Sequence, residues 1–155
     1  MMLSKLITPA NIKVNLESTE KDEVFEELLE VIVAAQPDIN RQEALKALLA
    51  REEKMSTGII PGIAVPHTIC NCAKGTVAAI GLSREGIEYA SLDGGPVHFI
   101  IMLLFEPGAT EAHLQMMKDV ADILQHRDFI NVIMEKKTSL AVYDAICDYE
   151  MLSQE

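Results

Sequence analysis

The strongest constraint on the fold is the apolar run Val97–Phe105, which reads VHFIIMLLF. Turn-forming residues bound it on both sides, at Asp93–Pro96 and at Glu106–Ala109. An apolar run of this length between two turns is typical of a strand that is buried on both faces of a sheet. Such a strand needs other elements on each side of its sheet, so the run predicts a layered domain.

Further strands are expected earlier in the chain. Asn11–Leu16 alternates polar and apolar residues, which is the period of a half-buried strand. Thr76–Leu82 reads as another strand, and Ile87–Tyr89 as a short extended piece. Leu3–Ile7 is expected to be an apolar lead-in that packs on the core.

Helix start signals interleave with these strands. Thr19 with Asp22, and Asn40 with Glu43, mark two helix starts, and Thr110 is the expected N-cap of a third helix. The residues expected to face the core are Leu45, Leu48 and Leu49 in the second helix, and Leu114, Met117, Val120, Ala121 and Leu124 in the third. Two later helices are expected, at Phe129–Met134 and Ser139–Tyr149. The alternation predicts a layered α/β domain with a mainly buried central sheet.

Length and charge narrow the class of protein. With 155 residues, the chain is expected to form one domain over residues 1–155. No apolar run approaches the roughly 20 residues of a membrane helix, and the first residues lack a signal-peptide core. We therefore expect a cytoplasmic protein without membrane insertion. The net charge of −11 argues against a nucleic-acid partner and favours a basic protein partner.

The cysteines do not form a recognisable framework. Cys70, Cys72 and Cys147 are too few and too clustered for a set of structural disulfides. Cys70-Asn71-Cys72 is not a CxxC pair, and no second Cys/His pair lies nearby, so it is weak as a metal site. We interpret Cys70 and Cys72 as two reduced thiols in a loop.

The stretch Arg51–Thr68, REEKMSTGIIPGIAVPHT, carries the candidate chemistry. Ile63–Val65 has the character of a short buried strand. Pro66 lacks a backbone N–H and therefore suits the end of a strand. His67 is then expected at a strand end, where sites form, and its imidazole could serve as nucleophile, base or ligand.

Other residues could complete a pocket around His67. His113 is expected in the first turn of a helix that follows a strand, and ligand sites in α/β sheets lie beyond strand ends. Arg51 offers a guanidinium, and Ser56, Thr57, Gly58 and Gly62 offer hydroxyls and backbone amides. Such a set is typical of a pocket for a tetrahedral oxyanion, with His67 as the nucleophile.

Spacing alone leaves other interpretations of these residues open. His67 could be an ordinary loop histidine, and Arg51 could simply cap its helix. Neither a Walker loop, nor a Rossmann fingerprint, nor a carboxylate cluster for Mg²⁺ is present, so we expect no cofactor and no metal.

One stretch resembles a known family. Arg51-Glu52, Ser56–Ile59 and Gly62–His67 together resemble the IIA component of the bacterial sugar phosphotransferase system, fructose/mannitol type, which includes nitrogen-regulatory IIA proteins. The resemblance covers nearly the whole chain and continues through Ile87, Leu92-Asp93, Pro96-Val97, Met102–Leu104 and His113-Leu114.

The resemblance implies an α/β fold with a mixed central sheet flanked by helices, and a phosphoryl carrier without a cofactor. The carrier protein HPr, or an HPr-like paralogue, would phosphorylate His67. His113 would support the phosphoryl group by hydrogen bonding, and Arg51 would neutralise its charge. Ser56 and Thr57 fall where the pocket hydroxyls lie, next to Gly58. The group would then pass to a IIB component, usually onto a cysteine.

The sequence departs from the family pattern directly after the histidine. Many relatives carry a small or basic residue where this chain reads Thr68-Ile69-Cys70-Asn71-Cys72, which bears on the choice of partner. Two rival functions remain open: a regulatory IIA protein whose phosphorylation state selects protein partners, and a metal-dependent hydrolase using His67, His113 and Cys70 or Cys72. Which sugar is served, if any, and whether the chain forms a homo-oligomer are also open.

Overall fold

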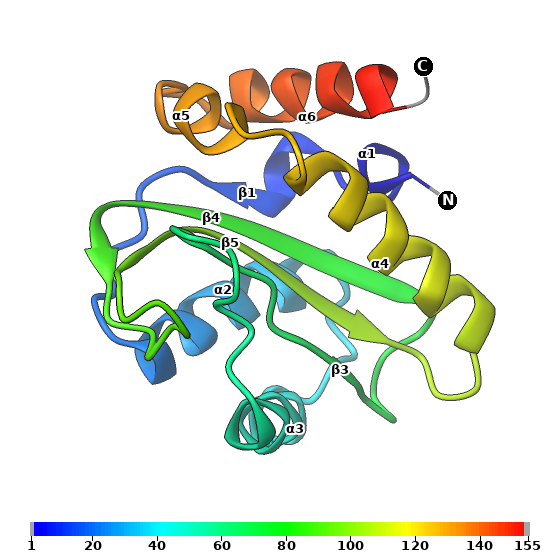
Figure 1. Ribbon diagram of the computed structural model, residues 1–155. Coiled ribbons are helices and arrows are strands. Elements are labelled where there is room, and N and C mark those ends of the chain that lie inside the picture. The colour runs from blue at the N-terminus through cyan, green and yellow to red at the C-terminus, as the bar shows by residue number, and fades with distance from the viewer. Residues whose placement is uncertain (1, 154–155) are drawn as a thin grey trace.

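The protein, as described over residues 2–153 by a computed structural model, has a central sheet between two layers of helices (Figure 1). One layer holds α1 (Leu3–Leu6), α4 (Thr110–Leu124), α5 (Phe129–Met134) and α6 (Ser139–Ser153). The opposite layer holds α2 (Lys21–Ala35) and α3 (Arg41–Lys54). The predicted layered α/β architecture is therefore confirmed.

The sheet is mixed, as the family resemblance implied. Its strands are β1 (Ile12–Lys13), β2 (Ile63–Ala64), β3 (His67–Ile69), β4 (Thr76–Ile87) and β5 (Val97–Phe105). Within the described residues the order is β1-β4-β5-β2, and β3 also pairs with β5. β4 and β5 run antiparallel, while β1 is parallel to β4 and both β2 and β3 are parallel to β5.

β5 is buried on both faces, as the apolar run predicts. Phe99, Ile101, Leu103 and Phe105 pack in the core under α4, α5 and α6. Ile100, Met102 and Leu104 alternate with them and pack in the core under α2 and α3. The two-residue period of a strand thus joins both cores through one element.

β2 and β3 lie one after the other along the same edge of β5. Ile63 pairs with Phe99, and His67 pairs with Leu103. Pro66 sits between the two strands, where its missing N–H costs no ladder hydrogen bond, and its carbonyl accepts from Leu103 N at 3.0 Å. The break lets the chain leave the sheet and return to it just before His67.

The helix starts are partly as predicted. Asn40 caps α3, since its side chain accepts a hydrogen bond from Glu43 N at 3.0 Å. The prediction for Thr110 is wrong by one residue: Ala109 is the N-cap, and Thr110 is the first helical residue. Thr19 does not cap α2: Glu20 is the N-cap, without a side-chain capping bond, and the Thr19 carbonyl accepts from Glu88 N at 2.8 Å.

Other boundaries also differ from the sequence expectation. β4 does not end at Leu82 but continues to Ile87, with a register shift between these two residues. Gly86, at φ +96°, allows the irregular backbone there, and Ser83 Oγ accepts its N–H at 2.9 Å. Leu114 was expected to face the core, yet it is 66% exposed. No helix within residues 2–153 is long and apolar enough to span a bilayer.

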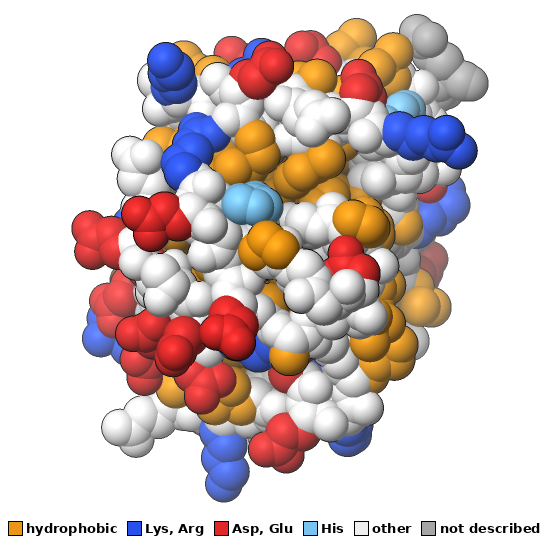
Figure 2. Space-filling view, turned by 60° about the vertical axis from the view of Figure 1, so that its left-hand side comes forward, with side chains coloured by type: hydrophobic (Ala, Val, Ile, Leu, Met, Phe, Trp, Pro, Cys, Tyr) orange, Lys and Arg blue, Asp and Glu red, His pale blue; other side chains and the backbone are white. Residues whose placement is uncertain are grey.

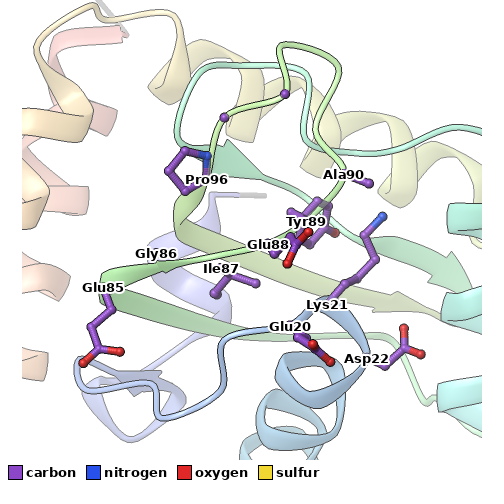
Figure 3. Close-up of a pocket in the computed structure, with 12 residues that line it drawn as sticks. Glu20, Lys21, Asp22, Glu85, Gly86, Ile87, Glu88, Tyr89, Ala90 and Pro96 are labelled. Carbon is purple, nitrogen blue, oxygen red and sulfur yellow. The ribbon is translucent and has the colours of Figure 1, made fainter.

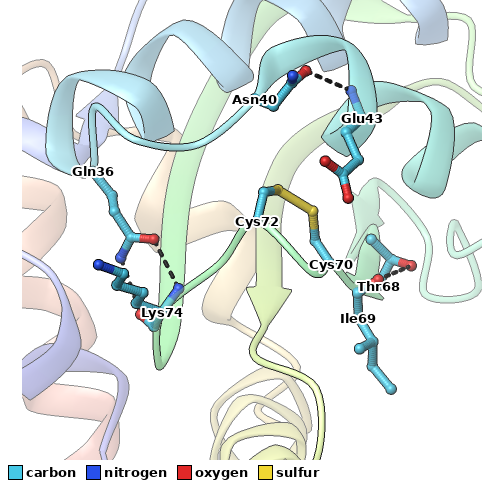
Figure 4. The surroundings of a disulfide bond; sticks show 8 residues. All are labelled: Gln36, Asn40, Glu43, Thr68, Ile69, Cys70, Cys72 and Lys74. Atoms are coloured by element: carbon cyan, nitrogen blue, oxygen red, sulfur yellow. Dashed lines mark hydrogen bonds between the residues drawn. A yellow bond between two sulfur atoms is a disulfide. The ribbon is translucent and has the colours of Figure 1, made fainter.

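The interpretation of Cys70 and Cys72 as reduced thiols is wrong: they form a disulfide (Figure 4). The physical reason is a tight turn after β3, in which Ala73 N donates to the Cys70 carbonyl at 3.1 Å. This turn brings the two Cα atoms to 5.2 Å, within the usual range for a disulfide. On the far side of the turn, Gln36 holds the backbone of Lys74 with two hydrogen bonds.

The disulfide predicts a simple thiol count. Protein alkylated under denaturing, non-reducing conditions should take up one label, on Cys147, which is the free cysteine. After reduction it should take up three labels. Intact mass and peptide mapping measure both numbers, and three labels without reduction would contradict the disulfide.

Two carboxylates, one of them buried, tie α1 to α4 and α6. Asp119 Oδ2 accepts from Leu3 N at 2.7 Å, and Glu150 Oε2 accepts from Ser4 N at 3.2 Å. Glu150 is 1% exposed. Burial raises the pKa of the Glu150 carboxyl, and the adjoining Asp119 side chain adds to the shift. A protonated Glu150 can donate to Asp119, so folding favours the neutral form.

We predict that Glu150→Gln stabilises the fold at neutral and higher pH. The folded pKa of Glu150 is raised above its ordinary value of 4.5. The stability that Glu150 contributes is therefore fully present below pH 4.5, and it is lost as pH rises through the folded pKa. The Gln amide keeps the neutral pattern, accepting from Ser4 and donating to Asp119. Urea unfolding at several pH values should give similar free energies of unfolding for the two proteins in acid, and a larger value for Glu150→Gln at higher pH. A difference between the two proteins that does not change with pH would contradict the prediction.

Candidate functional site

His67 is the first residue of β3, and a hydrogen bond holds one of its ring nitrogens. Its Nδ1 lies 2.7 Å from the Val65 carbonyl oxygen. A carbonyl only accepts, so Nδ1 must carry the proton and Nε2 must carry the free lone pair. The half-buried ring therefore presents a single nucleophilic nitrogen.

The surroundings of His67 favour its neutral form. Burial is the main cause that lowers the pKa of the imidazole, and the charges of Arg51 and His113 lower it further. The Val65 hydrogen bond and the negative charge of Glu52 act in the opposite direction, but the pKa stays below its ordinary value. A neutral ring keeps the Nε2 lone pair available near pH 7.

His113 lies beside His67. The two ring centroids are 6.1 Å apart, with an interplanar angle of 72°. The His113 ring also stacks on Phe105, with centroids 4.0 Å apart and planes inclined by 16°. Phe105 ends β5 and His113 lies in the first turn of α4, so the sheet edge positions the second histidine against the first.

Arg51 lies in the last turn of α3, near His67. It lines a cavity of about 220 Å³ together with Ser56, Thr57 and His67. Its Nη1 donates to the Met55 carbonyl at 2.9 Å, so it also caps the end of α3. Arg51 thus both caps its helix and faces the cavity that His67 lines. Arg51 and His113 each lie close enough to affect the His67 charge, but His113 does not line this cavity.

The loop Ser56–Gly58 is held by hydrogen bonds of its own. Thr57 is buried, and both its N–H and its hydroxyl donate to the Glu52 carboxylate. Ser56 Oγ accepts from Gly58 N at 3.1 Å, which leaves the Ser56 hydroxyl hydrogen free to donate. A Cβ at position 58 would lie 2.7 Å from Ser91 Oγ and 3.1 Å from Tyr89 Cδ1, so a larger residue would force these side chains to move.

Sequence reasoning missed several residues that support this loop. Glu52 is buried at 8% exposure, and Tyr89 donates to its Oε1 at 3.1 Å while Lys21 Nζ donates to its Oε2 at 3.0 Å. One signal was present: Ala44, Leu48 and Glu52 repeat every four residues on the buried face of α3. That spacing places a carboxylate in the core beside Arg51.

A second, larger cavity of about 700 Å³ lies at the far end of β5, where Ile87 pairs with Val97 (Figure 3). Its charged lining residues are Glu20, Asp22, Glu85, Glu88 and Lys21. Figure 2 shows acidic side chains gathered over part of the face at the left of Figure 1, where β4 ends. An acidic lining repels phosphate, so this larger cavity does not suit an oxyanion.

Exposed apolar side chains flank the His67 cavity. Met55 and Ile59 line it and are 52% and 60% exposed. Ile69 in β3 and Leu114, next to His113, are also exposed. Among residues 2–153, no three His, Cys, Asp or Glu side chains gather where they could hold a metal ion, and Cys70 and Cys72 are bonded to each other.

Comparison with known proteins identifies the family. The family model described as phosphoenolpyruvate-dependent sugar phosphotransferase system, EIIA 2, matches residues 5–149. The chain therefore belongs to this EIIA family, and the resemblance seen in the sequence is confirmed.

The chain is also similar to individual members of this family. The fructose-specific EIIABC component of Bacillus subtilis is 33% identical over 97% of this chain, which spans only 24% of that longer protein. Nitrogen regulatory protein IIA-Ntr of Neisseria meningitidis has the same fold, with a TM-score of 0.85 at 24% identity over 93% of this chain and 98% of that one. A complex of enzyme IIAMTL and phosphorylated IIBMTL of Escherichia coli also matches, with a TM-score of 0.76 at 16% identity over 92% of this chain and 97% of the other.

Proposed function

We propose that this protein is a phosphohistidine carrier of the sugar phosphotransferase system, which accepts a phosphoryl group from phosphorylated HPr or an HPr-like protein on Nε2 of His67. One observation carries the proposal: His67 Nδ1 donates to the Val65 carbonyl, which leaves Nε2 as the free nucleophile beside Arg51 and His113. The family match over residues 5–149 supports treating residues 1–155 as one EIIA domain that acts in the cytoplasm.

The chemistry is an in-line transfer between two imidazoles. The bond from phosphorus to His67 Nε2 forms while the bond to the donor nitrogen breaks, and that electron pair returns to the donor ring. The Val65 carbonyl stabilises the positive charge that develops on the His67 ring. Arg51 neutralises the oxygens, and His113 and the Ser56 hydroxyl donate to them. Positioning and charge stabilisation supply the rate, so no cofactor is needed.

The surface around the pocket fits protein partners. Met55, Ile59, Ile69 and Leu114 form an exposed apolar rim on which a partner can bury surface. The net charge of −11 favours a basic donor protein through electrostatic steering. The matching fold of a IIA protein in complex with phosphorylated IIBMTL supports a IIB component as the next acceptor, through a cysteine.

Phosphoryl transfer from labelled HPr tests the proposal. We expect His67→Ala to accept no label, because the nucleophile is gone. We expect His113→Ala to accept label but to transfer it to a IIB component about 10²–10³-fold more slowly, since it loses one stabilising donor. His126→Ala, which alters a histidine bonded to Ser153 and outside this pocket, is the matched control and should behave as wild type. Label mapped to another histidine in His67→Ala would overturn the assignment.

A regulatory role is the second candidate. The fold match to nitrogen regulatory protein IIA-Ntr covers nearly all of both chains, which supports this candidate. In this role, phosphorylation of His67 changes which protein is bound, and no sugar is transported. Affinity capture with phosphorylated protein and with His67→Ala distinguishes the two. A partner retained by only one form supports regulation, whereas transfer to a IIB component with no such partner supports transport.

A further inference from the structure

We propose that Glu52 is a positioning residue for phosphoryl transfer, which sets the ring orientation of His67 through Thr57 and Val65. The proposal rests on the proposed function only for its kinetic consequence, because the orientation of the His67 ring can be measured without any phosphoryl donor. Glu52 is a buried carboxylate that the transfer chemistry itself does not use.

The Glu52 carboxylate has a donor for each available position. Oε2 accepts from Thr57 N at 3.2 Å and from Lys21 Nζ at 3.0 Å. Oε1 accepts from the Thr57 hydroxyl and from Tyr89 OH, the latter at 3.1 Å. An apolar side chain of similar size would fill the space, but it would leave three buried donors of Thr57 and Tyr89 without this acceptor.

A continuous set of hydrogen bonds leads from Glu52 to the reacting ring. Glu52 holds both the N–H and the hydroxyl of Thr57, which fixes the plane of that residue. The Thr57 carbonyl accepts from Val65 N at 3.3 Å. The Val65 carbonyl in turn accepts from His67 Nδ1 at 2.7 Å. Moving Glu52 therefore moves the carbonyl that selects the tautomer of His67.

An ion pair with Lys21 also holds the Glu52 carboxylate, although Lys21 lies at a position that is unfavourable for a cation. Lys21 is the first residue of α2, where the helix dipole disfavours a cation. Its ammonium nevertheless reaches Glu52 and lies 4.3 Å from the centre of the Tyr89 ring (Figure 3). The ion pair is largely shielded, with side-chain exposures of 18% for Lys21 and 4% for Glu52. Removing one partner of such a pair is costly because the other remains buried.

The same contacts change the role expected for Thr57. Its hydroxyl hydrogen is directed to Glu52, and its oxygen lies 2.9 Å from Tyr89 OH. Thr57 therefore anchors the loop between α3 and β2, while the neighbouring Ser56 keeps a hydroxyl hydrogen for the phosphoryl oxygens. Arg51 precedes Glu52 in the last turn of α3, so the same turn delivers a cation to the pocket and an anchor to the loop.

The test compares Glu52→Gln with Glu53→Gln, which changes the exposed neighbour on the same helix. A glutamine keeps the shape but offers one acceptor oxygen to the four donors. We expect Glu52→Gln to shift the imidazole nitrogen-15 resonances of His67 toward mixed tautomers, and to slow transfer from phosphorylated HPr by about 10²-fold. Glu53→Gln should leave both readouts at wild-type values.

Thr57→Val and Thr57→Ser provide a second route if Glu52→Gln does not fold. Valine removes the hydroxyl that donates to Glu52 and should shift the His67 resonances in the same direction, whereas serine retains the hydroxyl and should restore them. Folded Glu52→Gln or Thr57→Val protein with an unchanged tautomer would overturn the proposal, even if transfer is slower. A tautomer shift together with a wild type that accepts no phosphoryl group would support Glu52 as the anchor and reject the proposed function.

Discussion

Burial of β5 on both faces is the constraint on which the site depends. A strand buried in this way cannot shift by one residue without moving every side chain to the opposite core. Its register therefore fixes the edge that β2 and β3 share, and it places His67 opposite Leu103. The same strand ends at Phe105, whose ring supports His113. Both histidines are thus located by one element that carries neither of them.

A set of hydrogen bonds near this apolar core sets the orientation of the His67 ring. The carbonyl of Val65 orients the His67 ring, and the Glu52 carboxylate holds the loop that in turn holds Val65. These groups are mostly shielded from water, where hydrogen bonds are directional and a missing partner is costly. Hydrogen bonds within the protein therefore hold the geometry around His67, which suits the phosphoryl-carrier role proposed for it.

Much of the architecture could be predicted from local pattern. Val97–Phe105 was placed with its observed bounds, as was the helix Phe129–Met134, because turn residues or sharp changes of period flank both. Asn40 caps its helix as expected, since capping needs only neighbouring residues. The predictions were wrong where contacts between residues far apart in the sequence determine an element boundary or the exposure of a side chain. The bridge between Glu20 and Glu88 fixes the backbone just before α2, which starts one residue later than Thr19 would set it. The irregularity at Gly86 hides the continuation of β4, and the orientation of α4 leaves Leu114 exposed.

The sequence by itself determined the class of the fold, the family, and the residue types of the pocket, because periodicity, turn chemistry and motif spacing are local properties. Only the tertiary structure decided that Arg51 and His113 both come close to His67, that Cys70 and Cys72 are joined, and that Glu52 supports the loop from within. The physical reason is the same in each case. Side chains from separate elements become neighbours only once the sheet register and the two buried cores fix how those elements pack.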